Sequence, residues 1–134
     1  MKATGITNGS YGWWGGGYQS SSVKYSIVDR LDYSNDSLNT TSRGLLSAGR
    51  SYPAGLNSIN YGWLAGADGV TIVDRITFTN DLVTASARTF TTTGLTGGRS
   101  GVSLPTFGWM GGGNTTYTGV ERLSFNNDLI SPVV

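Results

Sequence analysis

One aromatic and glycine-rich stretch occurs three times in the chain, and this repetition limits what the chain can fold into. The copies occupy residues 11–17, 61–67 and 107–113 and begin at Tyr11, Tyr61 and Phe107. Their starts lie 61 − 11 = 50 and 107 − 61 = 46 residues apart. Repeats of this length are typical of solenoids and propellers, in which each repeat is one small unit of secondary structure. We therefore divide the single predicted domain into repeats 1–50, 51–98 and 99–134.

Composition excludes several classes of function. Nine basic and eight acidic residues give the 134-residue chain a net charge of +1, so electrostatics predicts neither nucleic-acid nor membrane binding. The chain has no run of about 18 apolar residues and no visible signal peptide, and membrane insertion is not expected. It contains no cysteine and no histidine, which removes the usual zinc ligands and histidine-based acid–base catalysis. We predict no enzymatic activity, no catalytic residues, no metal and no cofactor.

Each repeat is predicted to contain four β-strands. A short strand precedes the aromatic stretch, which is itself the second strand, and a loop of variable length follows at residues 18–25, 68–71 and 114–119. The third strand occupies residues 27–33, 72–78 and 120–125 and leads to an Asn-Asp pair that favours a tight turn over a calcium site. The fourth strand is expected near residues 41–46 and 85–91.

The third repeat is predicted to lack its last strand. Only residues 129–134 follow Asp128, and Pro132 has no backbone N–H to donate to a sheet. Another chain could supply the missing strand, or residues 130–134 could replace it. The sequence thus predicts about two and three-quarter four-stranded repeats.

The order of strands, glycines and arginines resembles the kelch repeat of β-propellers, in which a di-glycine ends the second strand. Gly15-Gly16 and Gly111-Gly112 match the di-glycine, whereas the second repeat has Ala65-Gly66, and the tryptophan usual on the fourth kelch strand is absent. The chain is also similar to kelch-type repeats of phage virion proteins. This resemblance implies an all-β, kelch-like propeller that serves as a virion structural or decoration protein.

Fewer than three full blades cannot close a propeller, which takes about four to eight. Because each repeat buries its faces only against neighbours, we expect closure by oligomerisation, as a homo-oligomer or within a larger virion assembly. The alternative is a pseudo-threefold β-prism made by the three repeats alone.

Charged and aromatic residues recur at fixed repeat positions, which favours a structural role for them. We expect Asp29, Asp74 and Glu121 to accept hydrogen bonds from arginines on neighbouring strands or repeats. An acid–base interpretation is weaker, because each of these carboxylates is followed directly by an arginine. The predicted structural core of the repeats comprises Tyr11, Trp13, Tyr61, Trp63, Phe107 and Trp109 with the pairs Asp29-Arg30, Asp74-Arg75 and Glu121-Arg122.

Tyrosines in the variable loops are the candidate ligand-binding residues. Tyr18, Tyr25 and Tyr117 lie between the second and third predicted strands, where a rigid scaffold can present contacts. They support an alternative function, a lectin-like propeller that binds a glycan or a host receptor. The low charge and the abundance of Ser, Thr and Gly, together with the resemblance to kelch-type virion repeats, suggest a virion or extracellular surface.

Overall fold

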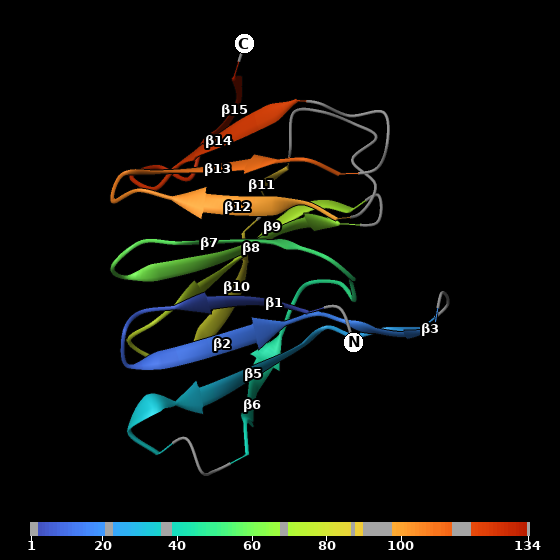
Figure 1. The fold of residues 1–134 in the computed structure, drawn as a ribbon, viewed down its shortest axis with the longest axis vertical. Helices are drawn as coiled ribbons and strands as arrows, with labels where there is room; N and C mark the ends of the chain where they lie inside the picture. Colours follow the sequence, from blue (N-terminus) through green and yellow to red (C-terminus); the bar gives the residue numbers. More distant parts are fainter. Residues whose placement is uncertain are drawn as a thin grey trace.

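The computed structural model describes residues 3–20, 23–35, 39–67, 70–86, 88–89, 98–113 and 119–133. Three antiparallel β-sheets are stacked along the long axis of the molecule (Figure 1). The described residues contain β-strands and one 3-10 turn, η1 at Tyr33–Asn35, and no α-helix. The prediction of an all-β fold is confirmed.

The first sheet has the strand order β1-β2-β5-β6. These strands are β1 (Thr4–Thr7), β2 (Tyr11–Gly15), β5 (Ile27–Asp32) and β6 (Thr41–Leu45). Where the sequence predicted a loop, β3 (Tyr18–Ser20) and β4 (Val23–Lys24) pair as a separate hairpin that projects from the stack (Figure 1).

The second and third sheets repeat the same order of antiparallel strands. The second contains β7 (Ala54–Asn57), β8 (Tyr61–Ala67), β9 (Val70–Thr77) and β10 (Leu82–Ser86), and β11 (Arg88–Thr89) also pairs with β9. The third contains β12 (Ser100–Ser103), β13 (Phe107–Gly111), β14 (Val120–Ser124) and β15 (Ile130–Val133).

The third sheet has a fourth strand, β15, so the prediction that the last repeat lacks it is wrong. Of the two alternatives for that strand, the one in which residues 130–134 replace it is the one found. Residues of β15 pair with β14, and Pro132 lies opposite Glu121. A proline is tolerated here because β15 is the outer strand of its sheet, so the missing N–H does not interrupt hydrogen bonding to a further strand. The end of the chain therefore completes its own repeat.

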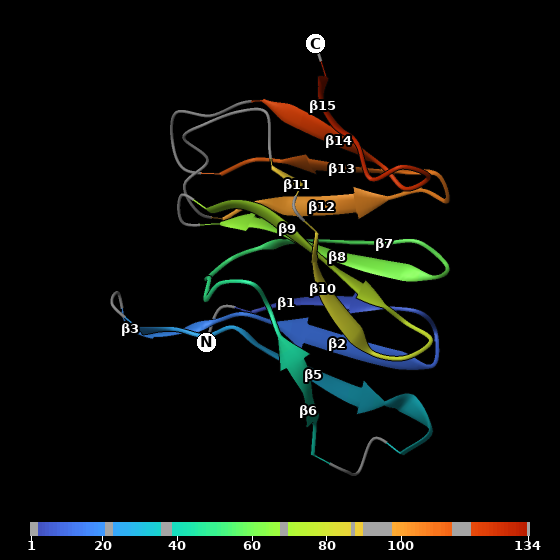
Figure 2. The same cartoon turned by 180° about the vertical axis from the view of Figure 1, so that it is seen from behind.

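The sheets form a row in which the second sheet lies between the other two (Figures 1 and 2). The first strands of the three repeats contact one another along the row: β1 packs beside β7, and β7 packs beside β12. A closed prism would bring the first and third sheets together. In the part of the chain that is described they lie at opposite ends of the row, and the expectation of a β-prism is wrong.

Each junction between sheets encloses a separate hydrophobic cluster. Side chains alternate between the two faces of a strand, so Trp13 points toward the second sheet and Trp14 away from it. Trp13 stacks on Phe78 with ring centroids 4.5 Å apart, and Trp63 stacks on Phe125 at 4.3 Å. Burial of one large apolar side chain stabilises a fold by about 1.5–3 kcal/mol, so these clusters hold the row together.

Backbone geometry explains the di-glycine and its exception. The second residue of each pair has a positive φ, namely 77° at Gly16, 63° at Gly66 and 77° at Gly112. Glycine adopts this conformation without steric cost. The first residue of the pair needs no positive φ, which is why the second repeat accepts Ala65 there.

Candidate functional site

The tip of the β9–β10 turn connects the second sheet to the first. Asp81 has a φ of 58°, in the left-handed region that Asp and Asn tolerate best after glycine. Its carboxylate accepts a 3.0 Å hydrogen bond from the indole Nε1 of Trp13 and forms an ion pair with the guanidinium of Arg30. Arg43 lies 3.6 Å from the same carboxylate. Trp13 and Arg30 are opposite each other on β2 and β5, so one face of the first sheet presents both donors.

The second junction repeats this arrangement with the turn of the third sheet. Asp128, with a φ of 55°, accepts hydrogen bonds from Nε1 of Trp63 at 3.2 Å and from Arg75 at 2.9 Å. The sequence indicated only that the Asn-Asp pairs form turns. Their second role, as acceptors for the preceding sheet, follows from contacts that span more than 50 residues and leave no local pattern.

The third sheet carries the same donors on its outer side. Trp109 and Arg122 lie opposite each other on β13 and β14, as the earlier pairs do. The guanidinium of Arg122 lies 4.8 Å from the ring centroid of Phe107, matching Arg30 over Tyr11 at 4.2 Å. Among the described residues, neither Trp109 nor Arg122 meets a carboxylate. This surface, which also includes Val102, is called the last outer face below.

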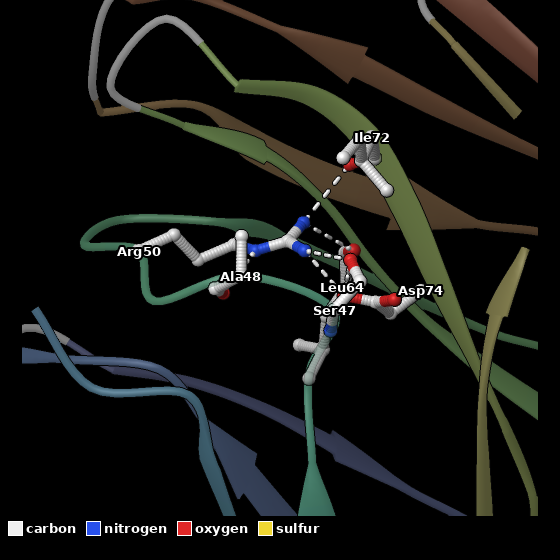
Figure 3. Close-up of polar contacts among 6 residues, drawn as sticks. All are labelled: Ser47, Ala48, Arg50, Leu64, Ile72 and Asp74. Atoms are coloured by element: carbon white, nitrogen blue, oxygen red, sulfur yellow. Dashed lines mark hydrogen bonds and ion pairs between the residues drawn. The ribbon is translucent and has the colours of Figure 1, made fainter. Parts of the chain in front are cut away.

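A buried arginine joins the first two sheets from the opposite end of the strands (Figure 3). The backbone of Arg50 bonds to the connections on either side of the β3–β4 hairpin in the first repeat, through Arg50 N to the carbonyl of Tyr25 and through Gly17 N to the carbonyl of Arg50. Its side chain reaches the second sheet, where it forms an ion pair with Asp74 and donates a 2.9 Å hydrogen bond to the carbonyl of Ile72.

Further contacts complete this cluster. The hydroxyl and backbone N–H of Ser47 each donate to the carboxylate of Asp74 at 3.1 Å, and the Arg50 side chain also contacts the carbonyls of Ala48 and Leu64. Burial lowers the pKa of Arg50, while the nearby Asp74 carboxylate opposes that shift. The predicted pairing of carboxylates with arginines on neighbouring strands or repeats is present here between two repeats, and again within the third repeat, where Arg99 meets Glu121 at 2.8 Å.

The first sheet has the equivalent carboxylate but no equivalent arginine. Asp29 lies opposite Trp14, as Asp74 lies opposite Leu64 and Glu121 opposite Met110. Among the described residues Asp29 has no ion pair or hydrogen bond through its side chain. We call the surface formed by Trp14, Ile27 and Asp29 the first outer face.

The candidate binding tyrosines do not converge on one site. Tyr18 lies in the projecting hairpin with its ring centroid 6.0 Å from that of Tyr52. The hydroxyl of Tyr25 donates a 2.7 Å hydrogen bond to Gln19, and Tyr25 lines a small pocket with Trp14. Tyr117 lies outside the described residues.

A second concave surface is an open groove of about 570 Å³ over the turns between the first two strands of all three repeats. It carries no charged side chain, and Thr7 and Asn8 use their side-chain oxygens in hydrogen bonds within their own turn. Nothing in this groove favours one class of ligand.

Neither a metal site nor a membrane-spanning helix is present in the described part of the chain. No group of three or more carboxylates is placed to hold a metal ion in those ranges. No helix within the same ranges is long and apolar enough to cross a bilayer.

Comparison with known proteins does not assign the chain to a family. No known protein-family model matches it, and no curated protein matches it in sequence. Membership of the kelch family stays a prediction.

Proposed function

We propose that the chain is a non-enzymatic structural module that assembles by stacking further sheets against its two outer faces. One observation carries the proposal: equivalent positions are buried at the internal junctions and exposed at the ends. Val102 is 66% exposed, whereas its equivalents Ile6 and Leu56 are 4% and 0% exposed. At the other end Trp14 is 38% exposed, whereas its equivalent Leu64 is fully buried. Each outer face thus carries half of a junction that the chain builds twice internally.

The chemistry of the last outer face supports the same proposal. Trp109 and Arg122 present an indole N–H and a guanidinium in the arrangement that receives an aspartate at both internal junctions. Exposed apolar side chains next to such donors are typical of surfaces that bind another protein. The expected partner is a sheet of the same kind, with an acidic turn at its edge.

The ion pairs of the buried carboxylates support a non-enzymatic role. The buried carboxylates Asp74 and Glu121 are already neutralised by Arg50 and Arg99. Carboxylates held in charge-assisted pairs of this kind stabilise structure. We therefore assign them to assembly and not to chemistry.

The finer form of the proposal is a kelch-like propeller closed by several copies of the chain, in a virion or on an extracellular surface. A repeated head-to-tail contact generates a closed ring when its rotation closes and an open filament when it does not. The resemblance to kelch-type virion repeats and the low charge of the chain support this setting.

Light scattering coupled to size-exclusion chromatography tests self-assembly. We expect a mass that is a multiple of 14.1 kDa. Arg122→Glu should shift the population toward the single chain, because it places a negative charge where an aspartate of the next sheet is expected. Lys24→Glu makes the same charge change on the projecting hairpin and should have no effect. A single 14.1 kDa species at about 1 mM protein would contradict self-assembly, since even a millimolar contact would then be populated.

Glycan or receptor binding through the loop tyrosines has weaker support. The ring of Tyr18 packs near Tyr52 and the hydroxyl of Tyr25 is bonded to Gln19, so neither side chain forms part of a shared platform. A glycan array with the unmodified chain and with Tyr18→Ala tests this alternative. Equal signals from both proteins would reject the role of Tyr18.

A further inference from the structure

The first outer face contains a small cavity that the proposed assembly does not by itself explain. It has a volume of about 210 Å³ and is lined by Ala3, Trp14, Gly16, Tyr25, Ile27 and Asp29. An indole ring forms one part of its wall and a carboxylate another. The combination of an aromatic face and a carboxylate suits a cation.

The repeat itself identifies which cation fits. Asp29 holds the position that Asp74 and Glu121 hold in the other two sheets. Both of those carboxylates bind an arginine, Arg50 in one case and Arg99 in the other. In both cases the arginine precedes the first strand of the repeat, in the sequence Gly-Arg-Ser. The chain therefore shows twice what this position recognises.

The cavity offers a guanidinium the same kinds of partner that surround Arg50 in Figure 3. Asp29 provides the carboxylate, and Ile27 lies in the position of Ile72, whose carbonyl accepts from Arg50. The indole of Trp14 replaces Leu64 and adds a surface over which a planar cation can stack. A lysine ammonium would use fewer of these partners, because it is a compact charge without a planar fork of donors.

We propose that this cavity is an arginine-binding site, and that it takes the arginine of an extended Gly-Arg-Ser segment from another chain. The inference rests on the proposed function, because it specifies what completes the first outer face. It assigns the two faces opposite chemistry: the last outer face receives a carboxylate, and the first receives a guanidinium. Because Arg50 and Arg99 are already buried against Asp74 and Glu121, the arginine that fills this cavity comes from a different segment of the same sequence type.

The test is an NMR titration with a capped peptide of sequence Ser-Ala-Gly-Arg-Ser, which is residues 47–51 of the chain. The signal of the Trp14 indole N–H reports on the cavity. We expect a saturable shift with a dissociation constant of about 1 mM, and no shift when citrulline, the uncharged isostere, replaces arginine in the peptide. The titration is run on the unmodified chain and on Arg122→Glu, whose first sheet is unaltered and which keeps the cavity uncovered if copies associate.

Two matched variants identify the carboxylate. Asp29→Asn should weaken binding of the arginine peptide by more than about tenfold. Asp32→Asn makes the same charge change three residues away, at a carboxylate whose lowered pKa comes mainly from hydrogen bonds with Ser34, and should bind as the unmodified chain does. Unchanged unfolding curves for both variants show that the fold is intact.

Three results would overturn the inference: no saturable shift with the arginine peptide, an equal shift with the citrulline peptide, or equal binding by Asp29→Asn. A shift of Trp14 with a simple sugar such as N-acetylglucosamine and none with the peptide would also overturn it and identify a glycan site. Failure of self-assembly is a separate result. A chain that stays monomeric yet binds the peptide through Asp29 keeps the arginine site and loses self-association.

Discussion

The indole N–H of Trp13 donates a 3.0 Å hydrogen bond to the carboxylate of Asp81, 68 residues further along the chain. The same carboxylate receives the guanidinium of Arg30, while the backbone of Asp81 forms the turn between β9 and β10 with a φ of 58°. One residue therefore shapes the turn of its own sheet and fastens the preceding sheet. Asp128 does both at the next junction.

Asp81→Asn separates these two roles. Asparagine tolerates the left-handed backbone as well as aspartate does, so the turn should persist while the charged acceptor is lost. Because hydrogen bonds to a charged group contribute about 1.5–3 kcal/mol, we expect a loss of that size in the free energy of unfolding, measured by urea denaturation. Asp32→Asn is the control and should cost clearly less, since among the described residues the Asp32 carboxylate accepts hydrogen bonds from Ser34 in its own turn. An unchanged free energy of unfolding in Asp81→Asn would show that Asp81 stabilises the fold through its turn and not through its charged carboxylate.

Trp63→Ala tests the buried junction between the second and third sheets. Trp63 is fully buried, stacks on Phe125 and bonds to Asp128. Removal of such a side chain typically costs about 3–5 kcal/mol, and we expect a loss in that range from urea denaturation followed by circular dichroism. Trp14→Ala on the exposed face is the matched control and should cost less than half as much. Equal losses would show that both indoles are buried in solution.

Gly16→Ala tests why the second glycine of the pair is present. A methyl group there would lie 2.6 Å from the backbone oxygen of Arg50, in a residue whose φ is already 77°. Gly9 has a similar φ of 89°, but a methyl group on it would have no neighbour within 4 Å, so Gly9→Ala measures the backbone strain alone. We expect Gly9→Ala to cost about 1–2 kcal/mol and Gly16→Ala clearly more, from the shift in thermal unfolding midpoint. Similar shifts in both variants would show that the first sheet has room to move away from Arg50.

Much of the local structure could be predicted from the sequence because its causes are local. Alternating side chains place Trp13 and Trp63 on one face of their strands, and the Asn-Asp pairs specify turns. The pairing of Arg50 with Asp74 was also predictable in kind, since a carboxylate inside a repeat needs a cation from nearby.

The sequence left open whether residues 130–134 replace the fourth strand of the third sheet, because Pro132 was judged by its own chemistry alone. Whether a missing N–H matters depends on which side of the strand has a neighbour, and β15 has one neighbour only, β14, in the described sheet. The sequence predicted a loop at residues 18–25, where the structure has the β3–β4 hairpin. In the described structure these two strands pair with each other alone, and their side chains show no strong alternation that would have predicted strands.

By itself the sequence determined the repeat, the alternation along each strand and the residues at each repeat position. Only the tertiary structure decided what those positions do. Trp14, Leu64 and Met110 are equivalent in sequence, yet the first is exposed and the other two are buried. Burial at a repeat position depends on whether another sheet packs against it, and that contact joins residues far apart in the chain. The same rule leaves Asp29 and Arg122 at the two ends of the row, each equivalent to a residue that is paired elsewhere in the molecule.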